Sequence, residues 1–548
     1  MSELLRAAWR RRWLLVANLY LVSPVLLYEL HLGEGGPDRS LLFVLPASVL
    51  TLLTAQLVLR DLRLTHVLLL PLYVTVMADL FVIVNHHTRL SSGMLLVLVE
   101  NQGDAGDYLG ARSGQLALAL ALLVLVVALV WRGLRGQEQR TPRAALVVAL
   151  LATVTFYAAV RSHVGQIEHV LSHDRSSPFG VVSQAITARS VYRSQELAAL
   201  SSRDFRFGAK RTRAVTEPET YVLVLGESAR PDRWQLFGAP VQTTPKLARL
   251  PGVHLFHDVV SQASLTKLAV PLLLTRGTIE DPRQAAGERS IVSALREAGF
   301  ETIWLSTQQC DPFTGAINRY SGEAGTVRFF ERRHDDVLVS ETADALAQAK
   351  SDKVFVVVHT MGSHYEYDSR LPAGFDPFDA RGAPDKHERL VRFYDDTVRL
   401  SDEVLTGLVE VVSRRPGRKA LWFVSDHGEN VEDDARALFG HNFDNEYDLP
   451  VPMFFWASPE YAAANADKLA QADAHARARL STRSVFHSLL DLADVTVGDE
   501  ATASRSVFSP RLAETPRMVK HDPVAVDFDR FVARTRGNAA GEEGHAAR

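Results

Sequence analysis

Carboxylate and imidazole side chains follow apolar runs in the second half of the sequence. Glu227 lies in the segment GESAR, directly after the run YVLVL, and Asp426 and His427 lie in SDHGE, directly after ALWFV. Carboxylate oxygens and imidazole nitrogens are ligands that Zn²⁺ binds in a roughly tetrahedral arrangement. A tight turn at Asp426 and His427 would let both side chains face one ion. These three residues are therefore candidate metal ligands.

Three further histidines occupy comparable places. His359 directly follows the apolar run 354–358, His364 comes shortly after it, and His441 follows Gly440. A histidine is often an ordinary hydrogen-bonded residue, and an Asp or Ser after a strand often caps the next helix. The recurrence of such residues after separate apolar runs favours a shared site over these ordinary roles.

The apolar runs are typical of buried strands in a parallel sheet, because they are continuous and rich in β-branched or aromatic residues. The expected strands cover residues 221–225, 302–305, 354–358 and 420–424, and the expected helices cover 290–298, 340–350 and 387–413. Alternating strands and helices predict an α/β fold with a mainly parallel sheet. Ligands bind such sheets at the carboxyl ends of the strands, where the candidate residues lie.

The first part of the sequence has a different composition, with long apolar runs and few charges. A helix needs roughly 20 apolar residues to span a membrane. The segments that approach this length are 13–30, 41–59, 67–84, 116–131 and 144–160. A cleaved signal peptide would explain one such run but not five. We expect a five-span helical bundle.

Arginine residues predict the orientation of this bundle. They gather in the N-terminal tail and in the links after the second and fourth spans, whereas the alternate loops hold only Arg39, Arg89 and Arg112. The positive-inside rule therefore places the N-terminus in the cytoplasm and everything after about residue 161 outside. In a bacterial cell this means a multi-pass inner-membrane protein with a periplasmic catalytic domain.

The remaining global features set limits on function. The net charge of -4 does not argue for a nucleic-acid partner, and the single cysteine, Cys310, excludes an internal disulfide. The expected domains are a membrane domain at 1–160, a linker with interfacial helices at 161–215, a catalytic domain at 216–535 and a disordered tail at 536–548. The loop 85–115 is long for a connection and suits an interfacial helix.

The ordered set of motifs resembles the membrane phosphoethanolamine transferases of the alkaline phosphatase and sulfatase superfamily, which include lipid A-modifying enzymes that confer polymyxin resistance. The matching segments are GESAR at 226–230, HTMGSH at 359–364, YDDT at 394–397 and SDHGE at 425–429. The resemblance implies a five-span bundle followed by an alkaline-phosphatase-like, or sulfatase-like, periplasmic domain.

The family's nucleophile is a threonine, and Thr266 falls at its position, five residues before Pro271. The two cysteines that flank it in the family are replaced here by Gln262 and Leu272. Ser264 and Ser228 are the alternative hydroxyls. The ordinary role of Thr266, capping the next helix, is compatible with catalysis, since a helix N-terminus also stabilises a phosphate.

The resemblance also implies ligands and substrates. Zn²⁺ would be held by Glu227, Thr266, Asp426 and His427, with a second ion possible. Phosphoethanolamine would pass from phosphatidylethanolamine to lipid A or another envelope acceptor, through a covalent phosphothreonine, in a protein that acts as a monomer. The expected substrate-binding residues are His364, His441, His359 and, in the loop 85–115, Glu100 and Asn101. Lys267 is added because it adjoins Thr266 and could place a positive charge near the phosphate, although the family pattern has a small residue there.

The sequence argues against one other function and leaves two open. A sulfatase needs a formylglycine precursor, and the segment CDPFT at Cys310 begins that pattern but lacks its arginine. A phosphoglycerol transferase of the same superfamily has a similar layout. An inactive membrane scaffold or sensor is the alternative outside enzymes, and the intact set of Glu227, Thr266, Asp426 and His427 argues against it.

Overall fold

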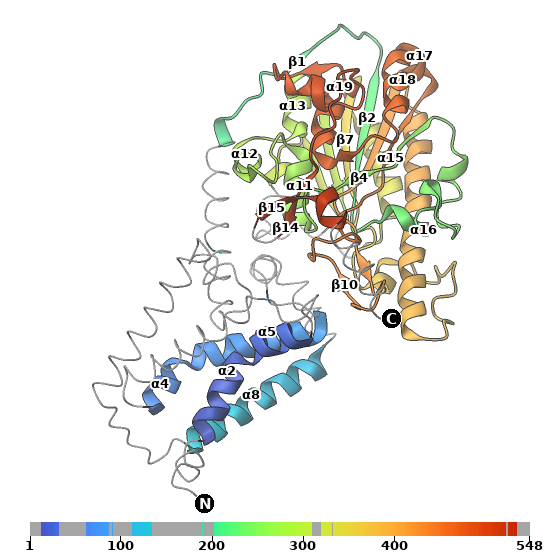
Figure 1. Cartoon of the computed structure of the whole chain (residues 1–548). Helices are drawn as coiled ribbons and strands as arrows, with labels where there is room; N and C mark the ends of the chain where they lie inside the picture. The colour runs from blue at the N-terminus through green and yellow to red at the C-terminus, as the bar shows by residue number, and fades with distance from the viewer. Residues whose placement is uncertain are drawn as a thin grey trace, which may run out of the picture. The chain divides into compact units, whose positions relative to one another are not determined.

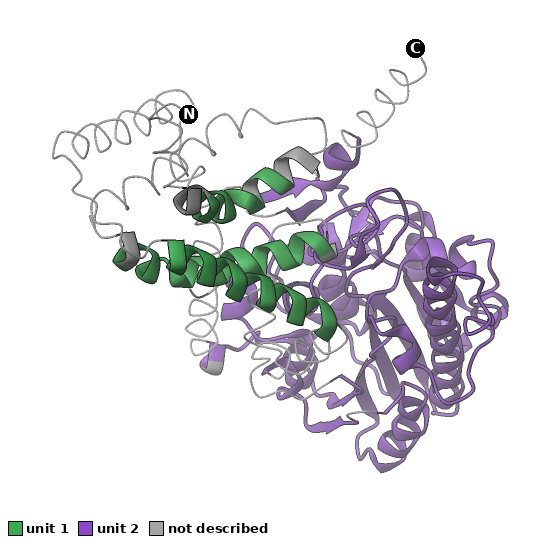
Figure 2. Cartoon of the chain, turned by 90° about the horizontal axis from the view of Figure 1, so that it is seen from below, with its two compact units in different colours: residues 1–192 green, residues 193–548 purple. Residues whose placement is uncertain are grey.

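The computed structural model describes residues 12–31, 62–86, 90, 112–133, 189, 202–308, 319–330, 333–521 and 524–533. The chain divides into two compact units, residues 1–192 and 193–548, which are coloured separately in Figure 2. The described residues of the first unit are helical, and those of the second form an α/β fold. The finer boundaries at residues 160, 215 and 535 stay predictions.

The first unit is helical in its described residues. Helices α2 (Arg12–His31), α5 (Leu70–His86) and α8 (Ser113–Gly133) pack against one another, and α4 (Leu62–Leu68) precedes α5 (Figure 1). Ala17, Leu21 and Val76 are among the apolar residues buried between them. Tyr20 adds a hydrogen bond of 3.1 Å from its hydroxyl to the carbonyl oxygen of Tyr73.

Three of the predicted membrane segments coincide with these helices. Among the described residues, α8 is the helix whose length and composition suffice to cross a membrane. The predicted first and third segments correspond to α2 and to α4 with α5. The segments predicted at 41–59 and 144–160 lie outside the described residues, so the count of five spans stays a prediction.

The second unit is built on a seven-stranded sheet in the order β3-β11-β8-β2-β7-β5-β6. Its strands are β2 (Glu219–Gly226), β3 (Val253–Phe256), β5 (Glu301–Ser306), β6 (Thr326–Phe329), β7 (Lys353–His359), β8 (Arg418–Ser425) and β11 (Met453–Ala457). All neighbouring pairs are parallel except those of β11, which runs antiparallel to β3 and β8. The prediction of a mainly parallel sheet is confirmed.

Helices cover both faces of this sheet. Val222 and Val224 of β2 pack in one apolar layer with α15 (Val337–Gln348) and α16 (Lys386–Ser413). Leu223 and Leu225 pack in the other layer with α11 (Thr266–Leu274), α13 (Ile291–Glu297) and α19 (Val485–Leu492). Successive strand residues point to opposite faces, and burial of both faces makes the strand a continuous apolar run. This explains why the central strands could be recognised in the sequence.

Several short elements complete the unit. Strands β4 (Val259–Val260) and β12 (Leu480–Ser481) pair in parallel, and β9 (Asn430–Val431) pairs with β10 (Phe439–Gly440). The hairpin of β14 (Met518–His521) and β15 (Val524–Asp527) packs Val519 beside Val260 and Leu449. These contacts bring a late segment of the chain to the loop that precedes α11.

Candidate metal centre and active site

Adjacent strand ends bring the predicted ligands together. Leu225 of β2 lies between Val424 of β8 and His359 of β7 in the sheet register. Glu227 and Asp426 follow these strand ends directly, and both are buried. Because parallel strands end at one edge of the sheet, residues distant in sequence share one site.

Thr266 completes this group from a different element. It is the first residue of α11, and its hydroxyl oxygen lies 3.1 Å from Oε2 of Glu227 and 3.1 Å from Nε2 of His427. The N-cap of the helix is Leu265, so Thr266 does not cap it. The hydroxyl is therefore directed into the cluster of candidate ligands.

The two alternative hydroxyls have other partners. Ser264 is fully buried and donates to Oδ1 of Asp444 at 2.5 Å. Ser228 is also fully buried and donates to Oε1 of Glu227 at 2.8 Å. Thr266 is half-buried, which leaves it the more accessible of the three.

The tautomer of His427 follows from its contacts. Nδ1 lies 2.8 Å from the carbonyl oxygen of Gly428, which can only accept, so Nδ1 carries a proton. In the neutral ring, Nε2 then presents a lone pair. It faces Oε1 of Glu227 at 3.3 Å and Oδ2 of Asp426 at 3.4 Å. Two carboxylates facing this nitrogen require a positive charge between them, either a proton on Nε2 or a bound cation.

The electrostatics of the cluster agree with this geometry. Burial, and then the charge of Asp426, raise the pKa of Glu227 to about 7, and burial raises the pKa of Asp426 as well. Burial alone would lower the pKa of His427, but the carboxylates of Asp426 and Glu227 outweigh it and raise the pKa to about 9. A bound divalent cation would supply the missing charge, since buried carboxylates need a partner. The donor set of two carboxylates and an imidazole fits Zn²⁺.

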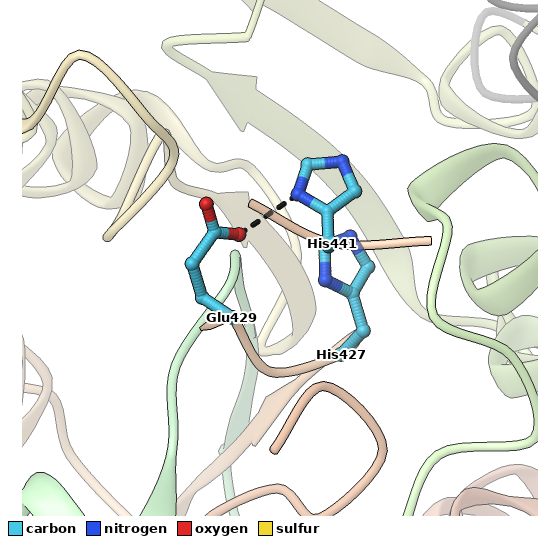
Figure 3. A group of neighbouring side chains, drawn as sticks. All are labelled: His427, Glu429 and His441. Carbon is cyan, nitrogen blue, oxygen red and sulfur yellow. Dashed lines mark hydrogen bonds and ion pairs between the residues drawn. The ribbon is translucent and has the colours of Figure 1, made fainter. Parts of the chain in front are cut away.

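A second group of side chains adjoins the first. His427, Glu429 and His441 have ligand atoms close enough to hold a metal ion, as Figure 3 shows. Nδ1 of His441 lies 2.8 Å from Oε2 of Glu429, and the ring centroids of His427 and His441 are 4.3 Å apart. The ring of His364 lies 5.4 Å from that of His441. These imidazoles offer N–H donors for a phosphate or ligands for a second ion.

The remaining predicted residues are placed differently. His359 is fully buried with its ring 5.9 Å from that of Trp304, in the layer that α11 covers, and burial lowers its pKa to about 3. Lys267 is the second residue of α11 and is half-buried. Glu100 and Asn101 lie outside the described residues.

Two supporting residues were not predicted. Nε2 of Gln308 donates to Oε2 of Glu227 at 3.1 Å and to the carbonyl oxygen of Thr360 at 2.9 Å. Asp335 accepts hydrogen bonds from the backbone N–H groups of Met361 at 2.9 Å and Gly362 at 2.8 Å. Asp335 thereby holds the turn that carries His364, and Gln308 orients Glu227. Glu429 was also left out of the predicted site, although it stands in the same motif as His427.

The loop before Thr266 is held from two sides. Asp444 accepts from Ser264 on one oxygen, and its other oxygen lies 3.2 Å from Nζ of Lys520 in β14. The backbone N–H of Lys520 donates to the carbonyl oxygen of Gln262 at 2.8 Å. We call Ser264, Asp444 and Lys520 the loop clamp. It ties the segment that presents Thr266 to the hairpin β14–β15.

Comparison with known proteins agrees with this arrangement. The sulfatase family pattern matches residues 219–495, which is half of the chain and includes all four candidate ligands. The chain belongs to the sulfatase family.

Several curated relatives are similar to this chain. The putative transferase YhbX of Escherichia coli (strain K12) is 30% identical over 247 residues, which is 44% of each protein. The phosphoethanolamine transferase EptC of the same organism is 25% identical over 55% of each. The Kdo(2)-lipid A phosphoethanolamine 7''-transferase of that strain is 26% identical over 67% of this chain and 71% of the relative. The chain spans about half the length of the first two, and the predicted resemblance to phosphoethanolamine transferases is confirmed.

Solved structures share the fold. The integral membrane lipooligosaccharide phosphoethanolamine transferase A (EptA) from Neisseria meningitidis matches with a TM-score of 0.65 at 20% identity, covering 88% of this chain and 93% of that one. The periplasmic domain of EptC from Escherichia coli, solved in complex with Zn, matches with a TM-score of 0.52 at 24% identity. That match covers 59% of this chain and 95% of the domain. The fold, a helical part followed by an α/β domain, is therefore shared.

Proposed function

We propose that this protein transfers phosphoethanolamine from phosphatidylethanolamine to lipid A or another acceptor in the bacterial envelope. The observation that carries the proposal is the position of Thr266. Its hydroxyl, at the first turn of α11, lies 3.1 Å from both Glu227 and His427 in a buried cluster that fits a divalent cation. A nucleophile, an ion site and the N-terminus of a helix meet at one point, and each of them can serve phosphoryl transfer.

The reaction is a double displacement. Thr266 gives up its hydroxyl proton to solvent and Oγ1 bonds to phosphorus, while the bond from phosphorus to the diacylglycerol oxygen breaks. The acceptor oxygen then attacks the same phosphorus, and Oγ1 of Thr266 leaves. Zn²⁺ held by Glu227, Thr266, Asp426 and His427 would lower the pKa of the hydroxyl and offset charge on the phosphoryl oxygens.

The second group of side chains acts on the protons and on the phosphate. Diacylglycerol leaves as an alcohol, so its oxygen must gain a proton, and His441 donates it from its protonated ring, whereas the neutral ring of His364 can donate a hydrogen bond to the phosphate. In the second step the imidazole of His441 removes the proton of the acceptor hydroxyl. The contact of 2.8 Å between His441 and Glu429 fixes the orientation of that ring.

The helical unit has a role in this proposal. Donor and acceptor are both lipids, and an enzyme confined to the same surface meets them at a raised effective concentration. Five spans with a cytoplasmic N-terminus would place the catalytic unit in the periplasm, and the apolar helix α8 supports such an anchor.

The test uses the full-length protein in vesicles that contain fluorescent phosphatidylethanolamine. We expect diacylglycerol release and a phosphoethanolamine adduct on the peptide that contains Thr266, detected by mass spectrometry. Thr266→Ala should form no adduct, whereas Thr266→Ser keeps the hydroxyl and should retain part of the activity. An adduct that persists in Thr266→Ala overturns the assignment of the nucleophile. A phosphoglycerol adduct would identify the related transferase instead, and a protein with neither zinc nor turnover would be a scaffold.

A further inference from the structure

Two arginine side chains lie together away from the metal centre. Arg483 belongs to the turn η7 (Thr482–Ser484) and precedes His487 of α19 by one helical turn. Arg505 is the last residue of α20 (Ala501–Arg505), which packs against α19. Its NH1 nitrogen lies 3.4 Å from Nε2 of His487. Residues one turn apart share a helix face, and the charges of Arg483 and Arg505 both act on His487.

His487 adds no charge to this cluster. A guanidinium can only donate, so Nε2 of His487 accepts from Arg505, and Nδ1 carries the proton that is donated to Oγ1 of Thr502 at 3.1 Å. The residue is fully buried, and burial lowers its pKa to about 3. The positive charge of the cluster comes from the arginines alone.

Neither arginine pairs with a carboxylate of the described residues. Among the residues that the structure describes, the side chain of Arg483 makes no hydrogen bond or ion pair, although its Nε is buried. Arg505 forms no ion pair with any described acid. A buried N–H group without an acceptor is costly, because its hydration is lost without replacement. An acceptor from outside this part of the chain would relieve that cost.

The neighbouring carboxylates Glu288 and Asp499 already pair with other groups. Arg276 binds both carboxylate oxygens of Glu288, at 2.8 and 2.9 Å, and also lies 3.4 Å from Oδ2 of Asp499. The other oxygen of Asp499 accepts from the backbone N–H of Ala501 at 2.9 Å. Glu280 is the remaining acid that acts on Arg505, and it is exposed.

The pKa of Arg505 also indicates an excess of positive charge in this cluster. Burial, and then the charge of Arg483, lower the pKa of Arg505, and the acids Asp499 and Glu280 only partly offset this. The positive charges of Arg483 and Arg505 thus act on each other at half-buried positions. A bound anion would stabilise both guanidinium groups.

We propose that Arg483 and Arg505 form a binding site for a phosphate group. Two planar guanidinium groups offer paired donors that match phosphate oxygens, and their combined charge matches a phosphate dianion better than a single carboxylate. The site is distinct from the metal centre. Arg276, which borders it, follows the end of α11, whereas Thr266 begins that helix, about 12 Å away at 1.5 Å per residue.

The test measures binding of radiolabelled inorganic phosphate to the full-length protein in detergent, after treatment with a chelator. Removing metal suppresses phosphate binding at the metal centre, so the remaining site is read alone. We expect saturable binding of one phosphate per chain. The double variant Arg483→Ala with Arg505→Ala should weaken it at least tenfold, and the double lysine variant, which keeps the charge, should retain part of the affinity.

Arg328→Ala is the matched control, because Arg328 is already paired with Glu341 and Gln348. It should leave phosphate binding unchanged. Competition identifies the source of the phosphate: displacement by glycerophosphoglycerol indicates a lipid headgroup, and displacement only by glycerol 3-phosphate indicates a phosphomonoester. Absence of saturable binding to the chelator-treated wild-type protein, or equal binding by the double alanine variant, overturns the proposal.

Discussion

The two ring nitrogens of His427 have different partners, and this asymmetry organises the metal centre. Nδ1 is fixed by the carbonyl oxygen of Gly428, so Nε2 is directed at the carboxylates and at Thr266. A histidine ligand is normally oriented by such a hydrogen bond on its other nitrogen. The geometry therefore has the form expected of a ligand and not only of a buried histidine.

Glu227→Gln should lose bound zinc. The substitution keeps the shape but removes the negative charge that faces Nε2 of His427, and a neutral amide is a weak zinc ligand. We expect the zinc content, measured by mass spectrometry of the purified protein, to fall well below one per chain. Glu460→Gln, at an exposed glutamate of α17 (Pro459–Ala464), should leave zinc content unchanged. Full zinc occupancy in Glu227→Gln would contradict the assignment.

Removal of the metal should also destabilise the catalytic unit. Without a cation, the carboxylates of Glu227 and Asp426 are buried beside each other, which is costly. A ligand present at about 100 times its Kd stabilises a fold by about 2.7 kcal/mol. We expect a chelator to lower the thermal midpoint, and added Zn²⁺ but not Mg²⁺ to restore it, since Mg²⁺ prefers all-oxygen sites. An unchanged midpoint would argue against a metal at this cluster.

The sequence predicted the candidate ligands better than it predicted the residues that hold them in place through hydrogen bonds. Glu227, Asp426 and His427 follow strands, so their convergence could be foreseen. Gln308 and Asp335 could not, because their partners Glu227 and Met361 are far away in the sequence. His359 shares the strand-end position but its side chain falls on the face under α11, which an apolar run does not distinguish.

Among the structural elements, the turn after β7 is tightly constrained. Gly362 has φ of +52°, and a Cβ there would lie 2.6 Å from the carbonyl oxygen of Glu227 and 3.0 Å from its nitrogen. Both the backbone conformation and the available space therefore favour glycine. The turn also carries His364, so its position links the two groups of the site.

Gly362→Ala should impair the metal centre, because the new methyl group must push the backbone of Glu227 away. We expect weaker zinc binding and a fall in turnover of at least about tenfold. The backbone strain should also lower the free energy of unfolding by about 1–3 kcal/mol. Gly374→Ala is the matched control, since Gly374 also has positive φ, +81°, but nothing lies within 4 Å of its Cβ. Equal zinc affinity and turnover in the two variants would show that the close approach to Glu227 is unimportant.

The loop clamp makes a prediction about turnover. Lys520→Ala removes the cation that lies 3.2 Å from Asp444, and the segment before Thr266 should become less well fixed. We expect kcat to fall about tenfold, the size of effect that misplacement of a reacting group produces, with zinc content unchanged. Lys520→Arg should restore most of the rate. A change in thermal stability with no change in kcat would limit the clamp to a structural role.

The elements differ in how far the sequence predicted them. Strands β2, β5, β7 and β8 were expected because both of their faces are buried. The hairpin β14–β15 was not expected, since its residues are mostly half-exposed and its place depends on contacts with Gln262 and Asp444. The antiparallel direction of β11 likewise depends on pairing between distant strands, which periodicity does not encode.

For the whole molecule, the proposal makes the helical unit part of the reaction. A protein lacking residues 1–192, the first compact unit, should still turn over a water-soluble phosphodiester of ethanolamine. Against phosphatidylethanolamine in vesicles it should lose about 100-fold or more in rate, because the effective concentration given by membrane anchoring is lost. The ratio of the two rates, compared with that of the full chain, is the measurement. Equal losses on both substrates would indicate damage to the catalytic unit.

The sequence predicted the division into two units more securely than the number of spans. Arginine placement and long apolar runs are strong signals for orientation, and α2, α5 and α8 coincide with three of the expected segments. The number of spans depends on residues 41–59 and 144–160, which lie outside the described structure.

The hairpin β14–β15 has a consequence for the timing of activity. Arg517, next to this hairpin, contacts the carbonyl oxygen of Asp258, a residue 259 positions earlier, just before the loop of Thr266. A ribosome makes all four candidate ligands long before it reaches this segment. Until residues 517–527 have been translated and exported, the nascent chain carries a complete set of ligands with an unfixed nucleophile. Under the proposed function, the protein would thus become active only after this late segment has been made and has joined the rest of the catalytic unit.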